Sequence, residues 1–189
     1  MEADWEIEIS LETPVIDAHW SGFVDLRTRP DIVATLEEVQ HFPPLGIILL
    51  RLNGPSSADI PSKPILFWSA KCDLWTPESI DPDEMEASPA ESAFVRACYI
   101  DLIPEDDTLF ASLPSLESHA RRIVAYLRTT PVRCSRVDLV LRQAVTRDSR
   151  GFGITAYTTV CGSDGAVAEQ ALETALDALV EAICSVKTS

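Results

Sequence analysis

The chain offers few side chains whose types and spacing suggest catalysis. Its three histidines, His19, His41 and His119, are scattered, and none stands in a local pattern with a cysteine or carboxylate that would define a catalytic triad. Asp17 and His19 come nearest to such a pattern, because residues two apart in a strand share a face and lie within hydrogen-bond reach. We expect His119 to lie on the polar side of a helix.

The sequence Lys71-Cys72-Asp73 has the most reactive side-chain types, but strand geometry divides it. Lys71 and Asp73 point to one face of a strand while Cys72 points to the other, so the three cannot act together. Cys72 is expected to share one side of the strand with Trp68, Ala70 and Leu74 and to pack as a small hydrophobe. Lys71 and Asp73 form either a plain surface ion pair or, between Phe67 and Trp75, a polar patch in an aromatic-lined surface.

The motifs do not indicate a metal, cofactor or phosphate site. Five cysteines, at positions 72, 98, 134, 161 and 184, include no Cys-x-x-Cys pair and no histidine at ligand spacing. The glycines on either side of Phe152 lack the strand-to-helix setting and the downstream lysine of a phosphate-binding loop. We therefore predict no metal ion, no cofactor, and reduced, unpaired thiols, with Cys72 and Cys184 buried.

Charge narrows the choice of partners. The 189 residues carry 30 acidic and 15 basic side chains, a net charge of −15, and this field repels polyanions, so nucleic-acid binding is not expected. Residues 1–92 hold 18 of the acids and 5 of the bases. The basic region is Arg121 to Arg150, with eight arginines, which either is neutralised by the acidic first half or receives an acidic partner.

The lack of recognisable targeting signals in the sequence predicts a cytoplasmic protein. The first residues are acidic and lack the basic start and apolar run of a signal peptide. No apolar stretch approaches the roughly 20 residues of a membrane helix, so membrane contact is not expected. Reduced thiols suit the same compartment.

Apolar periodicity predicts the elements that must position these side chains in the first half. Residues 5–11 alternate between apolar and polar types, the period of a strand with one buried face. The run 46–52 is apolar apart from Arg51 and predicts a central strand covered on both faces. The other predictions are a strand or hairpin within 15–26, a helix over 31–39 that ends before Pro43-Pro44, and a long strand over 64–75.

The second half begins after an acidic segment. Residues 76–93 contain six acids and no base, with three prolines, and predict a long exposed loop. Beyond it we predict a strand over 94–103, a helix over 112–130, a hairpin of strands over 136–145 and 152–161, and a final helix capped by Ser163 or Asp164.

Together these elements predict a single α+β domain over residues 1–189. Its sheet should be mainly antiparallel, with about three helices packed on one face. The order strand, helix, strand, strand recurs on both sides of the acidic loop. Two βαββ repeats, residues 1–75 and 94–189, are one interpretation, and chance recurrence in an α+β chain is the other.

No motif defines a reaction, so whether the protein is an enzyme stays open, and two classes of function remain. The first is a small acidic protein-binding module that meets a basic protein partner with its acidic loop, through Glu78, Asp81, Asp83, Glu84 and Glu86. The second is a small-molecule-binding domain or enzyme with a pocket between sheet and helices, lined by His19, Trp20, Lys71, Asp73, Trp75 and Tyr157. A homodimer formed through edge strands or through the mixed sheet face is a further arrangement.

Overall fold

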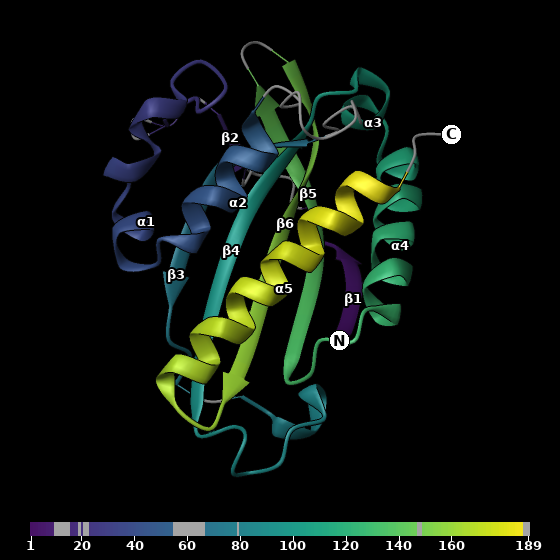
Figure 1. Ribbon diagram of the computed structural model, residues 1–189. Helices are drawn as coiled ribbons and strands as arrows, with labels where there is room; N and C mark the ends of the chain where they lie inside the picture. Colours follow the sequence, from purple (N-terminus) through teal and green to yellow (C-terminus); the bar gives the residue numbers. More distant parts are fainter. Residues whose placement is uncertain are drawn as a thin grey trace.

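A six-stranded sheet with the strand order β1-β5-β6-β4-β3 forms the centre of the molecule, and β2 pairs with β5 beyond the end of β1 (Figure 1). The computed structural model describes residues 1–9, 16–18, 20, 23–54, 67–78, 80–146 and 149–186. The strands are β1 (Glu2–Ile7), β2 (Ile16–Asp17), β3 (Phe67–Trp75), β4 (Phe94–Pro104), β5 (Ser135–Thr146) and β6 (Ser149–Gly162).

The sheet is mixed. The pairs β3–β4, β4–β6 and β5–β6 are antiparallel, whereas β1 and β2 run parallel to β5. The α+β class and the mainly antiparallel character predicted from the sequence are therefore confirmed.

The long helices cover one face of this sheet, the face that is toward the viewer in Figure 1. Helix α5 (Gly165–Ser185) crosses the middle strands, while α2 (Pro44–Asn53) packs on the β3 side and α4 (Leu113–Thr129) on the β1 side. The shorter helical segments are the 3₁₀ helices η1 (Pro30–Thr35) and η2 (Pro82–Met85), and α1 (Glu37–His41) and α3 (Asp107–Ala111).

Caps and apolar stripes account for α4 and α5, and the cap at Asp164 is one of the two that the sequence predicts. The Ser112 hydroxyl accepts the amide of Ser115, and the Asp164 carboxylate accepts the amide of Val167. Both helices bury a continuous stripe against the inward-facing residues of β4, β5 and β6, which together form the main core. This packing determines which face of the sheet the helices cover, and hence which side chains of β3 to β6 face away from them.

The prediction of a strand over residues 46–52 is wrong, because this segment belongs to helix α2. Pro44 occupies the first turn, where proline is well tolerated since its missing amide hydrogen has no helical partner there. Leu45, Ile48 and Leu52 are buried against the core, whereas Ile47 is 62% exposed, which is a helical rather than a strand period.

The repeat interpretation loses support from the same segment. It required a strand near residues 47–52 to correspond to β5, and that stretch is helical. The first half therefore runs from β2 through η1, α1 and α2 to β3, whereas the second runs through α3 and α4 to the β5–β6 hairpin.

An irregularity in β3 changes which of its side chains share a face. The pairing of β3 with β4 shifts register between Ser69 and Lys71. As a result Trp68 packs on the face away from the helices, while Cys72 packs against the main core. The expectation that Trp68, Ala70, Cys72 and Leu74 line one side of a regular strand is wrong for this reason.

Other boundaries differ from the predictions by a few residues. β1 begins at Glu2 and ends at Ile7, earlier than predicted, and residues 10 and 11 lie outside the described part. Within 15–26 the described strand is only β2, and the helix over 31–39 appears as η1 and α1. Among the described residues, no helix is long and apolar enough to cross a membrane.

Candidate functional site

The sheet face opposite the long helices carries the chemically distinctive side chains. An apolar cluster lies at each end of this face. The upper cluster contains Ile16, Ala18, Phe23, Trp68, Ala70, Ile103, Phe110 and Ala144, and the lower cluster contains Ile80, Met85, Ala87, Cys134 and Cys161. Between them lies what we call the central face: Lys71, Asp73, Trp75, Tyr99, Asp101, Asp138, Val140, Arg142, Thr155 and Tyr157.

Three aromatic rings from neighbouring strands form a cluster on the central face. Cross-strand pairing places Tyr99 of β4 opposite Tyr157 of β6, with ring centroids 5.9 Å apart. Trp75 of β3 lies 6.2 Å from Tyr99 and 6.3 Å from Tyr157, the latter edge to face. Trp75 is 38% exposed, so this aromatic cluster is accessible to a partner.

Two cations flank the aromatic cluster. The Lys71 ammonium lies 5.8 Å from the centroid of Tyr99 and 5.4 Å from that of Trp20, and the Arg142 guanidinium lies 5.6 Å from that of Tyr157. A hydrogen bond with Tyr99 raises the pKa of Lys71, while burial raises the pKa of the Tyr99 hydroxyl. At neutral pH this pair is therefore an ammonium beside a neutral phenol.

A buried carboxylate lies between these cations. Asp101 is 6% exposed and accepts a 2.6 Å hydrogen bond from the hydroxyl of Thr155, its cross-strand neighbour. Burial raises the pKa of Asp101, and the hydrogen bond from Thr155 and the charges of Arg142 and Lys71 partly offset this rise. Asp101 thus places a buried carboxyl group beneath the aromatic cluster, with the cations Lys71 and Arg142 near it.

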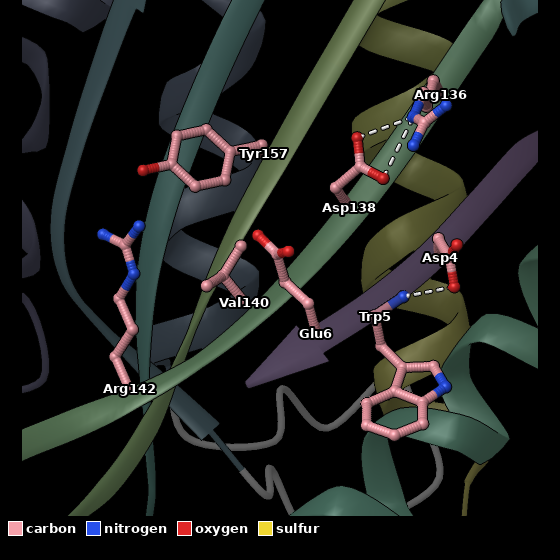
Figure 2. Close-up of a pocket in the computed structure, with 8 residues that line it drawn as sticks. All are labelled: Asp4, Trp5, Glu6, Arg136, Asp138, Val140, Arg142 and Tyr157. Carbon is pink, nitrogen blue, oxygen red and sulfur yellow. Dashed lines mark hydrogen bonds and ion pairs between the residues drawn. The ribbon is translucent and has the colours of Figure 1, made fainter. Parts of the chain in front are cut away.

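A groove of about 380 Å³ runs along the central face beside β1 (Figure 2). It is lined by Asp4, Trp5, Glu6, Arg136, Asp138, Val140, Arg142 and Tyr157. Figure 2 shows Tyr157 and Arg142 at one side of the groove, with the Arg136–Asp138 pair at the other. The hydrogen bond with Asp138 raises the pKa of Arg136, so Arg136 stays charged.

Acidic groups outnumber basic ones around this groove. Arg136 binds both Asp138, at 2.8 Å, and Glu84, at 3.3 Å, and Arg142 binds Glu8 at 2.5 Å. From β1, Asp4 reaches the groove paired with Arg128 at 3.6 Å, and Glu6 adds further negative charge. The arginines of the groove are therefore already paired with carboxylates, and further carboxylate charge lies beside them. This arrangement favours a cationic rather than an anionic ligand.

The acidic segment 76–93 borders the lower end of the central face, and it is more ordered than a free loop. It contains η2, whose first turn is capped by the Asp81 carboxylate, and Met85 and Ala87 are buried in the lower cluster. Ion pairs from Glu84 to Arg136 and from Glu91 to Arg133 connect it to β5 and to the residues before β5. The expectation of a fully exposed segment is therefore wrong for Met85 and Ala87, while Glu78, Asp81, Asp83, Glu84 and Glu86 are exposed.

The structure brings together most of the residues singled out from the sequence as ligand candidates. Lys71, Asp73, Trp75 and Tyr157 lie on the central face, and Trp20 contacts Lys71 at its upper border. They lie on the face away from α2, α4 and α5, so the expected place for their pocket, between sheet and helices, is wrong. His19 lies outside the described residues.

Sequence reasoning missed Tyr99, Asp101 and Arg142 as members of the site. The signal was present in part, because Tyr99 and Asp101 alternate with the core residues Ile100 and Leu102 along β4. Their positions next to Tyr157 and Lys71 depend on strand order, which the sequence did not provide.

The histidines and most cysteines lie elsewhere. His119 is fully buried, so the prediction that it lies on the polar side of its helix is wrong; its ring packs at 5.5 Å from that of Phe67. All five cysteines are free thiols, and Cys72 and Cys184 are half-buried rather than buried, whereas Cys98 and Cys161 are buried. Within the described ranges, no group of three or more histidine, cysteine or acidic side chains could hold a metal ion.

Comparisons with protein-family models, with curated proteins and with solved structures gave no match.

Proposed function

We propose that the protein is a protein-binding module whose central face and acidic segment together receive a basic protein surface. The observation that supports this proposal is the aromatic cluster of Trp75, Tyr99 and Tyr157 on the sheet face opposite the long helices. Such aromatic side chains, with arginine, are the residue types that contribute most to binding at protein interfaces.

The geometry of the central face suits a protein surface. The two apolar clusters lie at its ends, and between them the aromatic rings are flanked by charged groups, an arrangement that resembles an anchor region with a polar rim. The three rings come from three neighbouring strands, which hold them in place. Little conformational entropy would therefore be lost on binding.

Charge supports a basic partner. The carboxylates of Asp73 and Asp138 lie opposite Tyr99 and Tyr157 in the sheet. Glu6 lines the groove beside β1, and the exposed acids of segment 76–93 lie at the lower end of the central face. Positive groups on a partner would be attracted over several ångströms, which increases the rate of association more than the final affinity.

Site-specific photocrosslinking tests this proposal. A photoreactive amino acid at Tyr157 should capture a basic protein in cells of the native host, and the same amino acid at Glu173, on the exposed side of α5, should not. Trp75→Ala and Tyr157→Ala should each weaken binding of the captured protein by about tenfold or more. Equal capture from both positions, or a captured protein whose affinity is unaffected by both substitutions, would contradict the proposal.

A second function is favoured by one observation, the groove of about 380 Å³ beside β1, whose volume falls within the usual range for small-molecule sites. In this alternative, Tyr157 and Arg142 would contact a small cationic or zwitterionic ligand. Screening a library of small cations for protection against thermal unfolding separates the two functions. A ligand that raises the melting temperature of the parent protein, but not of Arg142→Ala, would favour the small-molecule site.

A further inference from the structure

Two cysteines outside the central face lie directly opposite each other across a strand pair. Ser135, the first residue of β5, pairs with Val160 of β6, so one further step along the ladder places Cys134 opposite Cys161. The amide of Cys161 donates a 2.9 Å hydrogen bond to the carbonyl of Cys134, which extends the ladder to this pair.

The two side chains also meet. Cys134 packs against the lower cluster that contains Cys161, Met85 and Ala87. Burial and the neighbouring Cys134 thiol, which is a hydrogen-bond partner, raise the pKa of Cys161 to about 11. Cys134 itself has a φ of 53°, in the left-handed region that residues other than glycine adopt only when the surroundings hold them there.

The two thiols differ in their access to solvent. Cys134 lines a cavity of about 210 Å³, together with Met85, Glu86 and Arg133. Cys161 does not line it and is only 1% exposed. A small molecule in this cavity could reach Cys134 first, and Cys161 only through Cys134.

We propose that Cys134 and Cys161 are a redox-responsive pair that a small-molecule disulfide, such as oxidised glutathione, converts to an intramolecular disulfide. The Cys134 thiolate attacks one sulfur of the small disulfide and forms a mixed disulfide, and one small thiolate leaves. The Cys161 thiolate then attacks Cys134 Sγ, and the second small thiolate leaves. In total, the two protein thiols lose two electrons and two protons. The small disulfide takes up the electrons, and the two thiolates released from it take up the protons.

Backbone spacing supports ring closure at this position. The single hydrogen bond from the Cys161 amide to the Cys134 carbonyl continues the antiparallel β5–β6 pair by one step. Opposed residues in such a pair have Cα atoms about 4.5–5.5 Å apart, within the range that a disulfide spans. Cys72 and Cys98 provide an internal comparison, because both lie on the helix-covered face of the sheet. Their direct cross-strand partners are Ile100 and Leu74, so these two cysteines are diagonal to each other and less well placed.

The pair lies under the acidic segment, because Met85 and Ala87 pack against it. Oxidation of the pair nevertheless does not depend on the proposed function, because it involves only the two thiols and the small disulfide.

Alkylation and mass spectrometry test the proposal. The folded protein is incubated with oxidised glutathione, denatured, alkylated with N-ethylmaleimide and digested. The expected result is two fewer alkylated cysteines than in the reduced protein and a linked peptide that joins Cys134 to Cys161. The oxidised protein should also melt at a higher temperature, because the bond restricts the unfolded chain.

Variants distinguish the role of Cys134, which attacks the small disulfide first, from that of Cys161, which closes the intramolecular disulfide. Cys161→Ala should accumulate the glutathione adduct on Cys134, because the second attack is missing, whereas Cys134→Ser should yield neither adduct nor disulfide at Cys161. Cys72→Ser, the matched control, should oxidise like the parent protein. A disulfide between Cys72 and Cys98, oxidation only between molecules, or five alkylated thiols after prolonged incubation would overturn the proposal.

Discussion

The Thr155 hydroxyl donates a 2.6 Å hydrogen bond to Asp101 at the centre of the sheet face that the helices leave open. Both side chains are buried, at 1% and 6% exposure, on adjacent strands β6 and β4. This hydrogen bond and the charges of Lys71 and Arg142 favour the ionised form of Asp101, whereas burial disfavours it and raises the pKa of the carboxyl group.

We predict that Asp101→Asn is at least as stable as the parent protein at pH 7. Burial raises the pKa of Asp101 above its ordinary value of 3.8, so the ionised form destabilises the folded state, and this effect grows as pH rises through the folded pKa. An amide avoids that cost while its oxygen still accepts the hydrogen of Thr155. Urea unfolding of both proteins at several pH values measures the difference.

Asp101→Ala and Thr155→Val are the matched comparisons. Each removes one partner of the hydrogen bond, and each should lower the free energy of unfolding by about 1–3 kcal/mol. If Asp101→Asn is as destabilising as Asp101→Ala, the carboxylate has a structural role that the hydrogen bond does not explain.

We predict that His119 makes the protein less stable in mild acid. Burial lowers the pKa of His119 from 6.5 to about 4, so between these values the unfolded chain binds a proton that the folded chain does not. Stability from the neutral ring is complete above pH 6.5 and is lost as pH falls toward 4. The loss should reach about 3 kcal/mol.

The variant His119→Leu isolates this effect from the titration of the carboxylates. Compared with the parent protein, it should gain stability on going from pH 7 to pH 4, because leucine takes up no proton in either state. Since the Nε2 atom of His119 is buried without a hydrogen-bond partner among the described residues, leucine leaves no broken bond at that atom. A pH-independent difference between the two proteins would contradict the assignment.

Gly151 is predicted to resist substitution, because β6 passes close to α3 there. A Cβ atom on Gly151 would lie 2.3 Å from the carbonyl oxygen of Phe110, which is backbone and cannot move aside without shifting α3. Gly151→Ala should lower the free energy of unfolding by about 1–3 kcal/mol. Gly165→Ala, at the start of α5 with open space around it, should change stability by less than 1 kcal/mol or raise it. Thermal unfolding of both variants checks the contrast.

Sequence patterns predicted the elements whose periodicity is long and regular. The stripes of α4 and α5 and the alternation in β4, β5 and β6 matched the structure because each repeats over several turns or residues. Residues 46–52 failed because a short apolar run fits a buried strand and a buried helix equally well. Pro43-Pro44 was interpreted only as the end of the preceding helix, although Pro44 also begins α2.

The candidate site was predictable only within single strands. The alternation of Lys71, Asp73 and Trp75 along β3 appeared in the sequence, but their neighbours Tyr99 and Tyr157 depend on the order β6-β4-β3. His119 could have been placed correctly, because it lies three residues after Leu116 and four before Ile123, on the buried stripe of α4. The register shift in β3 has no sequence signal that we can identify.

The acidic segment is predicted to set the rate of association with the basic partner captured at Tyr157. Neutralising Glu78, Asp81, Asp83, Glu84 and Glu86 together should slow association by about tenfold or more at low ionic strength, and the difference should shrink as salt is added. Stopped-flow or surface-based kinetics at several salt concentrations measures both effects.

Folding should be little affected by these substitutions. Glu84 is exposed, and Arg136 keeps its second partner, Asp138, when Glu84 is neutralised, so loss of the Glu84–Arg136 ion pair should cost about 0–1 kcal/mol. The Asp81 cap of η2 contributes a similar amount. The matched control neutralises five exposed acids elsewhere, namely Asp31, Glu37, Glu169, Glu173 and Glu181, for the same change in net charge. If the control slows association equally, total charge and not the acidic segment steers the partner. If neither set changes the rate, the segment does not contact a basic surface, and the groove beside β1 becomes the better candidate.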